Sequence, residues 1–380
     1  MEVAPAHLEY WLRDYYFSTE IDISGSGVEN FSFGELRQIL NITPDDLDRI
    51  VLRDSRTLGD PELRTAIGNR FANGNAERVM ATNGSSEAMY LITQALLNPG
   101  DEVVVLDPCY QQLFSIAEAI GCELKRWRLR IEKSFRPDLG EARRLIGPRT
   151  RMIIVNFPHN PTGASLTHAE QDELIDLAAN AGAYLLWDAA FAELTYDTPS
   201  LPDPGERYER SITLGTLSKA YGLPGLRVGW CLAAPEVLER LVRLRDYTTL
   251  ATSPLVEYVA TRAIENGDLL VQPRLVQARH NLGLLVEWAN RHREFVSLVP
   301  PQGGVCSFMR IHGVADIEHF CRQLVDDYSV LLVPGTSFGD PNYVRLGFGC
   351  SATELTEALS RLSAHFHTYR GSRQTSAVAV

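Results

Sequence analysis

Short runs of apolar residues alternate along the first two thirds of the chain with longer stretches in which apolar residues recur every three or four positions. The apolar runs are VMAT at 79–82, VVVL at 103–106, MIIV at 152–155, YLLW at 184–187 and SITL at 211–214. Strands that are apolar throughout are buried on both faces, and the amphipathic stretches between them supply the helices that cover those faces. The pattern predicts an α/β protein with a mostly parallel sheet.

The helical stretches between the runs are SSEAMYLITQALL, QQLFSIAEAI and AEQDELIDLAAN. A further helix is expected to begin at Pro61, because proline is well suited to the first turn of a helix. After about residue 250 the pattern changes to a long helical stretch over 253–291, followed by the strand-like runs QGGVCSFMRI, VLLVPGTSFG and YVRLGFG. This mixture indicates a second, smaller α+β domain.

These changes of pattern divide the chain into four parts. Residues 1–50 are irregular and punctuated by glycine, and are expected to contribute to the small domain and to the active site. Residues 51–250 form the large domain, and residues 251–368 form the small domain. Residues 369–380 lack apolar periodicity, which predicts a disordered tail.

Composition narrows the class of protein. Of the 380 residues 45% are hydrophobic and 22% are charged, as in soluble globular proteins, and the net charge is −12. An acidic chain is a poor match for nucleic acid or an anionic membrane, and the apolar runs are too short to span a bilayer. The six cysteines are scattered and the nine histidines lack metal-ligand spacing, so we expect reduced thiols, no metal site and a cytoplasmic location.

Polar clusters follow several predicted strands, where ligands bind in open α/β sheets. Gly84, Ser85 and Ser86 open a helix after the first run, and free N–H groups with hydroxyls there suit a phosphate. Asn160 follows the third run and Asp188 the fourth. From the residues alone, a helix cap, a plain turn and a strand-end cap explain these clusters equally well.

Lys219 follows the last run, in SITLGTLSKAYGLPGLRVGW. An unpaired buried ammonium is costly, so such a lysine either reaches the surface or has a shifted pKa and reacts. Two other motifs fail here. TLSK has threonine at the nucleophile position of S-x-x-K, and the Gly25-Ser26-Gly27 run lacks the third glycine of a dinucleotide loop.

The order of the motifs is more specific than any one of them. NGSSEA, DPCY, NFPHNPTG, WDAAF and TLSKAYGLPGLRVGW, in that order, resemble the fold-type I pyridoxal-phosphate enzymes of the aspartate aminotransferase superfamily. The resemblance extends from about residue 20 to residue 365. It implies a pyridoxal 5'-phosphate cofactor, a small-molecule amino acid substrate, and a homodimer whose active site lies at the two-fold interface.

The resemblance also implies residue roles. Lys219 would bind the pyridoxal aldehyde covalently and later act as the base at the substrate Cα. Asp188 would pair with the pyridine nitrogen, Asn160 would hydrogen-bond the phenolic oxygen, and Tyr110 would stack on the ring. The phosphate would be held by Gly84, Ser85, Ser86, Thr216, Ser218 and Arg227, and the substrate α-carboxylate by Arg345 and the backbone of Gly27.

Two departures from the superfamily narrow the resemblance. Phe191 replaces a tyrosine that bonds the phenolic oxygen, and residues 53–59 lack the tyrosine that reaches the partner subunit's phosphate.

Three further stretches resemble the capreomycidine synthase group and its relatives in streptothricin and viomycin biosynthesis. They are ISGSGVENFSFGELR, LLWDAAF and RDYTTLATSPLVE. This resemblance implies a hydroxylated arginine as substrate, loss of its β-hydroxyl and closure of the guanidine onto Cβ. The carboxylate that binds the guanidinium stays open among Asp22, Glu29, Asp54 and Glu193.

Two alternatives remain. The first is an ordinary aminotransferase, or an oxidase acting on arginine. The second is a non-catalytic ligand sensor with the same fold. Such sensors carry a fused helix-turn-helix domain, and residues 1–50 contain no basic recognition helix.

Overall fold

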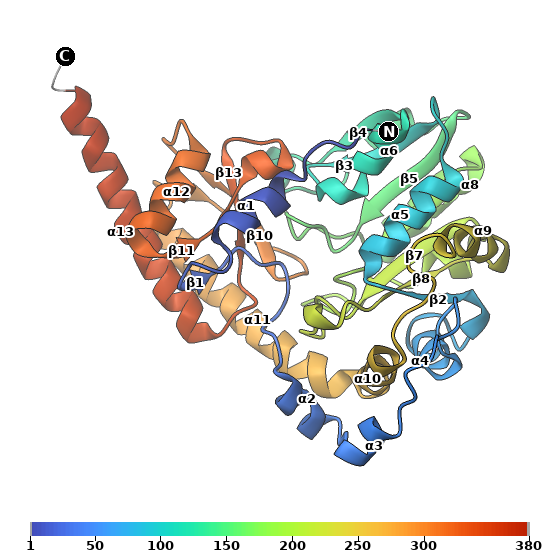
Figure 1. Cartoon of the computed structure of the whole chain (residues 1–380). Helices are drawn as coiled ribbons and strands as arrows, with labels where there is room; N and C mark the ends of the chain where they lie inside the picture. The colour runs from blue at the N-terminus through green and yellow to red at the C-terminus, as the bar shows by residue number, and fades with distance from the viewer. Residues whose placement is uncertain (1, 378–380) are drawn as a thin grey trace.

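A seven-stranded sheet is the largest element of the computed structural model, which describes residues 2–377 (Figure 1). Each strand is parallel to its neighbours except β8, which is antiparallel to both β2 and β7. The mostly parallel α/β fold predicted from the sequence is therefore confirmed. The strands in spatial order are β2 (Val79–Thr82), β8 (Gly229–Leu232), β7 (Ser211–Thr216), β6 (Tyr184–Asp188), β5 (Thr150–Asn156), β3 (Glu102–Asp107) and β4 (Glu123–Arg128).

The five apolar runs all become strands of this sheet, and two of its strands were missed. β4, with the sequence ELKRWR, lies at the edge of the sheet and pairs only with β3, so its charged side chains stay at the surface. β8 follows the glycine-rich turn after Lys219 and begins at Gly229, which hides its strand pattern.

Helices cover both faces of this sheet (Figure 1). α4 begins at Pro61, as predicted. The QQLFSIAEAI stretch is not one helix, because a 3-10 turn over Gln111–Leu113 separates it from α6. The covering helices are α4 (Pro61–Phe71), α5 (Ser85–Leu96), α6 (Ser115–Ile120), α7 (Leu139–Leu145), α8 (His168–Ala181) and α9 (Pro235–Arg245).

The C-terminal elements surround a second sheet of four strands. Its order is β12 (Val333–Pro334), β13 (Tyr343–Gly347), β10 (Cys306–Ile311) and β9 (Val296–Ser297). The long helical stretch after residue 250 divides at Asn266 into α10 (Pro254–Glu265) and α11 (Gly267–Arg291). α11 and α13 (Ala352–Ala377) pack together, and α12 (Ile317–Tyr328) packs against α13 (Figure 1).

The expectation that residues 1–50 are irregular is wrong. They contain α1 (His7–Tyr15), β1 (Ile21–Asp22), α2 (Phe33–Ile39) and α3 (Pro44–Asp48). Capping boxes start two of these helices, with Ser32 and Glu35 for α2 and Thr43 and Asp46 for α3. β1 pairs with β11 (Val330–Leu331), which brings the start of the chain to its C-terminal elements.

The expected disordered tail over 369–380 also needs correction. The backbone of α13 remains helical to Ala377, and residues 378–380 lie outside the described part of the chain. Residues 369–377 contain no proline, so nothing in the sequence forces the helix to stop.

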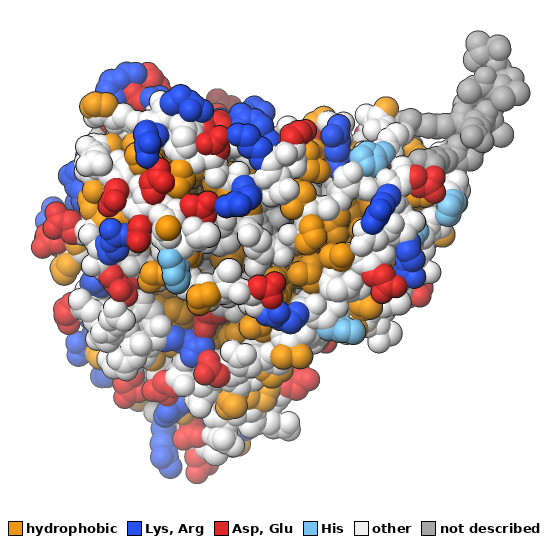
Figure 2. Space-filling view, turned by 180° about the vertical axis from the view of Figure 1, so that it is seen from behind, with side chains coloured by type: hydrophobic (Ala, Val, Ile, Leu, Met, Phe, Trp, Pro, Cys, Tyr) orange, Lys and Arg blue, Asp and Glu red, His pale blue; other side chains and the backbone are white. Residues whose placement is uncertain are grey.

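The surface shows both signs of charge. On the face drawn in Figure 2, acidic and basic side chains lie interspersed. None of the helices within residues 2–377 has both the length and the apolar character needed to cross a lipid bilayer.

Candidate active site

A cavity of about 760 Å³ lies at the carboxyl ends of the central strands. Nearly all the residues singled out in the sequence line it, and they come from the loops after β2, β3, β5, β6 and β7, from β13 and from the N-terminal segment. These residues are Gly27, Ser85, Ser86, Tyr110, Asn160, Asp188, Thr216, Ser218, Lys219, Arg227 and Arg345. Gly84 lies directly beside them, against Arg227.

One end of the cavity has the form of a phosphate site. Gly84 is the N-cap of α5 and has a φ of +77°, and a Cβ added there would lie 2.5 Å from Arg227 Nη2. The glycine therefore lets the guanidinium approach the start of a helix whose first N–H groups have no intrahelical partner. The hydroxyls of Ser86, Thr216 and Ser218 line the same cavity, so the donor set suits a phosphate dianion.

Asp188 stands at the end of β6 and is held from two sides. The Ala190 N–H donates to Oδ1 at 3.1 Å, and Asn156 Nδ2 donates to Oδ2 at 3.1 Å. Burial raises the pKa of Asp188 to about 6, while the Ala190 hydrogen bond and the positive charge of Lys219 oppose the shift. A carboxylate that forms no ion pair in the described chain suits a protonated pyridine nitrogen.

Asn156 was not among the residues chosen from the sequence. Its side chain also accepts the Asn160 N–H at 2.7 Å, so it positions both Asp188 and Asn160. Asn156 is the last residue of β5 and the first residue of NFPHNPTG. The signal was therefore present, four residues before the asparagine that was chosen.

Lys219 lies half-buried in the cavity, and its Nζ donates to Ser26 Oγ at 2.9 Å. Burial and, to a smaller extent, the positive charge of Arg345 together lower the pKa of Lys219 to about 8. The lysine therefore does not snorkel to the surface but is a partly neutral amine, as a nucleophile requires. Ser26 was missed, because its glycine-flanked run was considered as a dinucleotide loop and for the backbone of Gly27, and not for the serine hydroxyl.

Arg345 comes from β13 and is only 2% exposed. Its Nε and Nη2 donate to Ser24 O at 3.2 and 2.7 Å, and its Nη1 donates to Asn160 Oδ1 at 3.3 Å. Burial lowers the pKa of Arg345, yet a guanidinium stays charged in proteins. Within residues 2–377 it forms no ion pair, so its charge is available to a substrate carboxylate.

The structure separates the four carboxylates considered for a guanidinium. Asp22 and Glu29 line the cavity, and Asp54 and Glu193 do not. Glu193 instead pairs with Arg70 at 2.5 Å, and Glu29 pairs with Arg274 at 2.7 Å. Asp22 accepts the N–H and the hydroxyl of Ser24 and, in the described chain, has no basic partner.

Two further carboxylates line the cavity and were missed. Glu9 Oε1 accepts the Tyr110 hydroxyl at 2.7 Å. Burial and the nearby charges of Asp22 and Glu29 raise the pKa of Glu354. No local motif marks either residue, because α1 and α13 are brought to the cavity by tertiary packing, such as the hydrogen bond from Trp11 Nε1 to Leu332 O at 2.7 Å.

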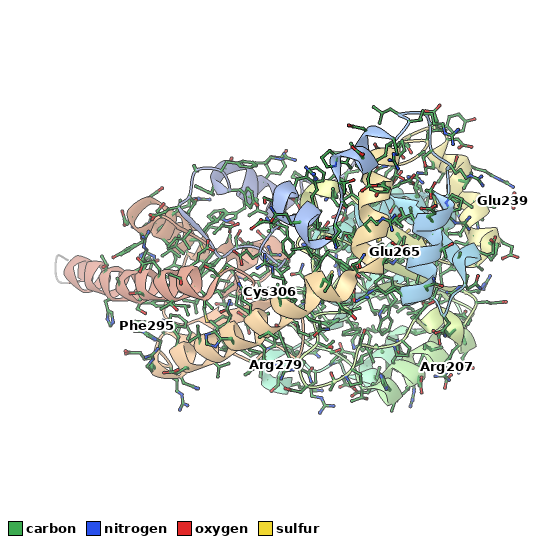
Figure 3. The ribbon with its side chains drawn as sticks, turned by 90° about the horizontal axis from the view of Figure 1, so that it is seen from below. Arg207, Glu239, Glu265, Arg279, Phe295 and Cys306 are labelled. Carbon is green, nitrogen blue, oxygen red and sulfur yellow. The ribbon has the colours of Figure 1, made fainter. Side chains whose placement is uncertain are left out.

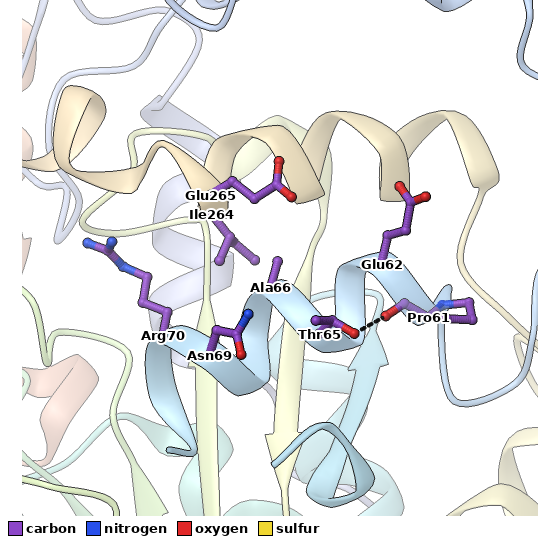
Figure 4. A pocket seen from close by; sticks show the side chains of 8 residues that line it. All are labelled: Pro61, Glu62, Thr65, Ala66, Asn69, Arg70, Ile264 and Glu265. Atoms are coloured by element: carbon purple, nitrogen blue, oxygen red, sulfur yellow. Dashed lines mark hydrogen bonds between the residues drawn. The ribbon is translucent and has the colours of Figure 1, made fainter. Parts of the chain in front are cut away.

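One groove outside this cavity does not share its chemistry. A groove of about 550 Å³ between α4 and α10 is lined by Thr65, Asn69, Arg70 and Glu265, among others, and holds none of the predicted residues (Figure 4). Cys306 lies near the middle of the molecule in Figure 3, with its Sγ 3.8 Å from Asn160 Oδ1. It therefore belongs to the packing behind the cavity.

Comparison with known proteins identifies the family of this chain. Residues 37–362 match the family described as Aminotransferase class I and II. Capreomycidine synthase from Streptomyces vinaceus is 46% identical over 372 residues, which are 97% of this chain and 96% of that protein.

Two solved structures are also similar. The PLP-dependent cyclase OrfR superposes with a TM-score of 0.93 at 41% identity, over 97% of this chain and 98% of its own. A PLP-dependent aminotransferase from Streptococcus suis 89-1591 superposes with a TM-score of 0.91 at 32% identity, over 97% and 99%.

Proposed function

This chain belongs to the class I and II aminotransferase family and uses pyridoxal phosphate, and on that basis we propose that it cyclises a hydroxylated L-arginine in antibiotic biosynthesis. The observation that supports this most directly is the pairing of charges in one cavity. Arg345 and Asp22 line it together, and neither forms an ion pair within the described chain. An α-amino acid with a guanidinium side chain satisfies both.

The cofactor would occupy the end of the cavity nearest the central sheet. Lys219 would bind its aldehyde, Asp188 its pyridine nitrogen and Asn160 its phenolic oxygen, and Tyr110 would cover a ring face. The phosphate would be held by Gly84, Ser85, Ser86, Thr216, Ser218 and Arg227. When bound, pyridoxal phosphate supplies an electron sink for the charge that develops at the substrate Cα.

The substrate would be held at its two charged ends. Arg345 binds the α-carboxylate through its fork of N–H donors, with the backbone of Gly27 beside it. Asp22 binds the guanidinium, which orients one guanidine nitrogen toward Cβ. Glu9 and Glu354 add negative charge to the same part of the cavity.

Lys219 would move the proton. Its Nζ takes the Cα proton, and the Cβ–O bond breaks as the leaving hydroxyl takes a proton from solvent and departs as water. A guanidine nitrogen then bonds Cβ and releases its proton to solvent, and Nζ returns a proton to Cα. Substrate minus one water is the only product besides water, so no oxo acid is consumed.

An ordinary aminotransferase is the alternative, because the Streptococcus suis protein has the same fold. An oxidase acting on arginine is a further variant of that alternative. A non-catalytic sensor is less favoured, because Lys219, Asp188, Asn160 and Arg227 meet in one cavity.

Mass spectrometry of the product tests the proposal. Holoenzyme given 3-hydroxyarginine without any oxo acid should yield a product lighter by one water, and in heavy water this product should carry one deuterium at Cα. Arginine is the control substrate, since it lacks the leaving hydroxyl. Turnover that requires an oxo acid, with the matching amino acid formed in equal amount, would contradict cyclisation and support the aminotransferase.

A homodimer in the cytoplasm completes the proposal. Val51, Leu52 and Tyr247 are 69%, 78% and 91% exposed. Their two segments lie together, because Ser55 bonds Glu257 and Thr57 bonds Arg245. Exposed apolar side chains on adjoining segments suit a subunit contact, and six free cysteines suit a reducing compartment. Light scattering at micromolar concentration should give twice the mass of one chain, and a monomer would contradict this.

A further inference from the structure

Arg245 is a fully buried arginine behind the phosphate end of the cavity. It is the last residue of α9, it is 0% exposed, and it does not line the cavity. Its Nε lies 3.1 Å from Glu87 Oε1 and its Nη2 lies 3.3 Å from Glu87 Oε2. The guanidinium therefore grips the carboxylate with two parallel hydrogen bonds, the geometry in which arginine binds best.

Glu87 joins this pair to the cofactor site. It lies in the first turn of α5, and its Oε2 accepts the Asn83 N–H at 2.5 Å and the Asn83 side-chain amide at 3.2 Å. Asn83 is the residue before Gly84, where the phosphate site begins. Glu87 thus fixes the turn that presents the N–H groups of Ser85 and Ser86 to the cavity.

Arg245 also fixes the strand that leads into this turn. Its Nη1 donates to Ala81 O at 2.8 Å and also to Thr57 O. The segment of Thr57 is tied to β2 a second time, because the Ala81 N–H donates to Leu58 O at 2.9 Å. This segment lies within residues 53–59, which lack the tyrosine expected to reach the partner subunit's phosphate. In the structure it instead holds β2 and Arg245 of its own chain in place.

The charges of the pair matter as much as its contacts. A carboxylate in the first turn of α5 lies close to the place of a phosphate dianion and repels it, because charges in a protein interior are weakly screened. Arg245 compensates that charge. Burial lowers the pKa of Arg245, and the charge of Glu87 opposes this shift.

We propose that Arg245 is a positioning residue for the cofactor phosphate, acting through Glu87 and the Asn83–Gly84 turn. The proposal rests on the cofactor site and not on cyclisation, so it holds for a cyclase and an aminotransferase alike. If the product assay contradicts cyclisation, the proposed role of Arg245 is unaffected.

The test compares ligands with and without the phosphate. Apoenzyme is titrated with pyridoxal phosphate and with pyridoxal, followed by visible absorbance, and with inorganic phosphate, followed by thermal shift. Arg245→Met should weaken pyridoxal phosphate by about tenfold or more and pyridoxal by less than about twofold. The thermal shift caused by inorganic phosphate should be lost.

Two variants keep the test independent of folding. Glu87→Gln removes the repelling charge and leaves an acceptor for the Asn83 N–H, so its affinity for pyridoxal phosphate should be equal to or higher than that of the wild type. Arg245→Met combined with Glu87→Gln should recover most of the lost affinity. Arg243→Met is the matched control, because Arg243 lies on the same helix and pairs only with exposed Glu239 in the described chain.

The outcomes are distinct. A loss of affinity in Arg245→Met that is confined to ligands bearing phosphate, together with equal or higher affinity in Glu87→Gln, supports the proposal. Equal weakening of pyridoxal and pyridoxal phosphate would overturn it, because that is the result of general loosening. If Arg245→Met does not fold, Glu87→Gln alone decides, and a selective loss of pyridoxal phosphate in that variant would also overturn the proposal.

Discussion

The two ends of the active-site cavity are built in different ways. The cofactor end is made by residues that directly follow strands of one sheet, such as Ser85, Asp188 and Lys219. The substrate end is made by Glu9, Asp22, Arg345 and Glu354, which come from α1, β1, β13 and α13. One end depends on local sequence, and the other depends on how distant elements pack.

The difference extends to hydrogen bonding. At the cofactor end, side chains are already held by the protein, as Asp188 is by Asn156 and Ala190. At the substrate end, Asp22 has only hydroxyl and amide partners, and Glu354 faces other carboxylates. A resident cofactor needs a preformed site, whereas a substrate that enters and leaves must supply the missing charge itself.

Replacement of Lys219 tests the cofactor end and should have the largest effect. Lys219→Ala should lower kcat by at least about 10³-fold, because it removes both the covalent attachment and the base at Cα. Lys133→Ala is the control, since Lys133 pairs with Asp138 at the surface. In the wild type, borohydride should fix the cofactor on the Lys219 peptide, and labelling of another lysine would show that the site is misassigned.

Replacement of Asp22 tests the substrate end. Asp22→Asn should raise KM for 3-hydroxyarginine by about tenfold to a hundredfold, because the guanidinium loses a charged hydrogen-bond partner. The visible spectrum of the bound cofactor should not change. Glu29→Gln is the matched control, since Glu29 is already paired with Arg274.

A β-hydroxy amino acid without a guanidinium sharpens this result. Its KM should be similar in wild type and Asp22→Asn. If the variant raises KM for both substrates equally, Asp22 acts on the shape of the cavity and not on the guanidinium.

Nearly all the residues that the structure brings together at the cofactor end were chosen from the sequence. The apolar runs gave the strands, and the polar residues after each strand gave the site, since parallel strands bring their carboxyl ends to one edge. Only Asn156 and Ser26 were missed there, and both lie inside motifs recognised in the sequence, NFPHNPTG and the Gly25-Ser26-Gly27 run. The choice among a cap, a turn and a binding group came from the order of the motifs, not from any one of them.

The substrate end could not be predicted in the same way. Asp54 and Glu193 were candidates for binding the guanidinium along with Asp22 and Glu29, because the position of a residue in the sequence does not reveal whether its loop faces the cavity. Glu9 depends on α1, which the sequence analysis had treated as irregular. Glu354 depends on the start of α13, after β13 has placed Arg345.

Cofactor capture as a function of pH tests the link between the two ends, and its effect should be moderate. Only the neutral amine attacks the aldehyde, so the capture rate should rise as pH passes through the Lys219 pKa of about 8. Arg345 lowers this pKa, so Arg345→Gln should raise it and move the profile to higher pH. Stopped-flow absorbance of apoenzyme mixed with pyridoxal phosphate measures both profiles, and Arg322→Gln, in an exposed pair with Glu318, is the control.

Phe191 should give the smallest effect, because it changes one hydrogen bond. Its ring is 3% exposed and lines the cavity, and its centroid lies 5.8 Å from Lys219 Nζ. Phe191→Tyr supplies the hydroxyl that the superfamily resemblance led us to expect beside the phenolic oxygen. A donor stabilises the charged oxygen, so the spectral pKa of the bound cofactor should fall by about half a unit to one unit.

Tyr196→Phe is the control, because the Tyr196 hydroxyl donates to Gly304 O and does not line the cavity. A spectral pKa that rises or stays the same in Phe191→Tyr would mean that the ring does not face the phenolic oxygen, and the cofactor end would then be less completely preformed than its hydrogen bonds indicate.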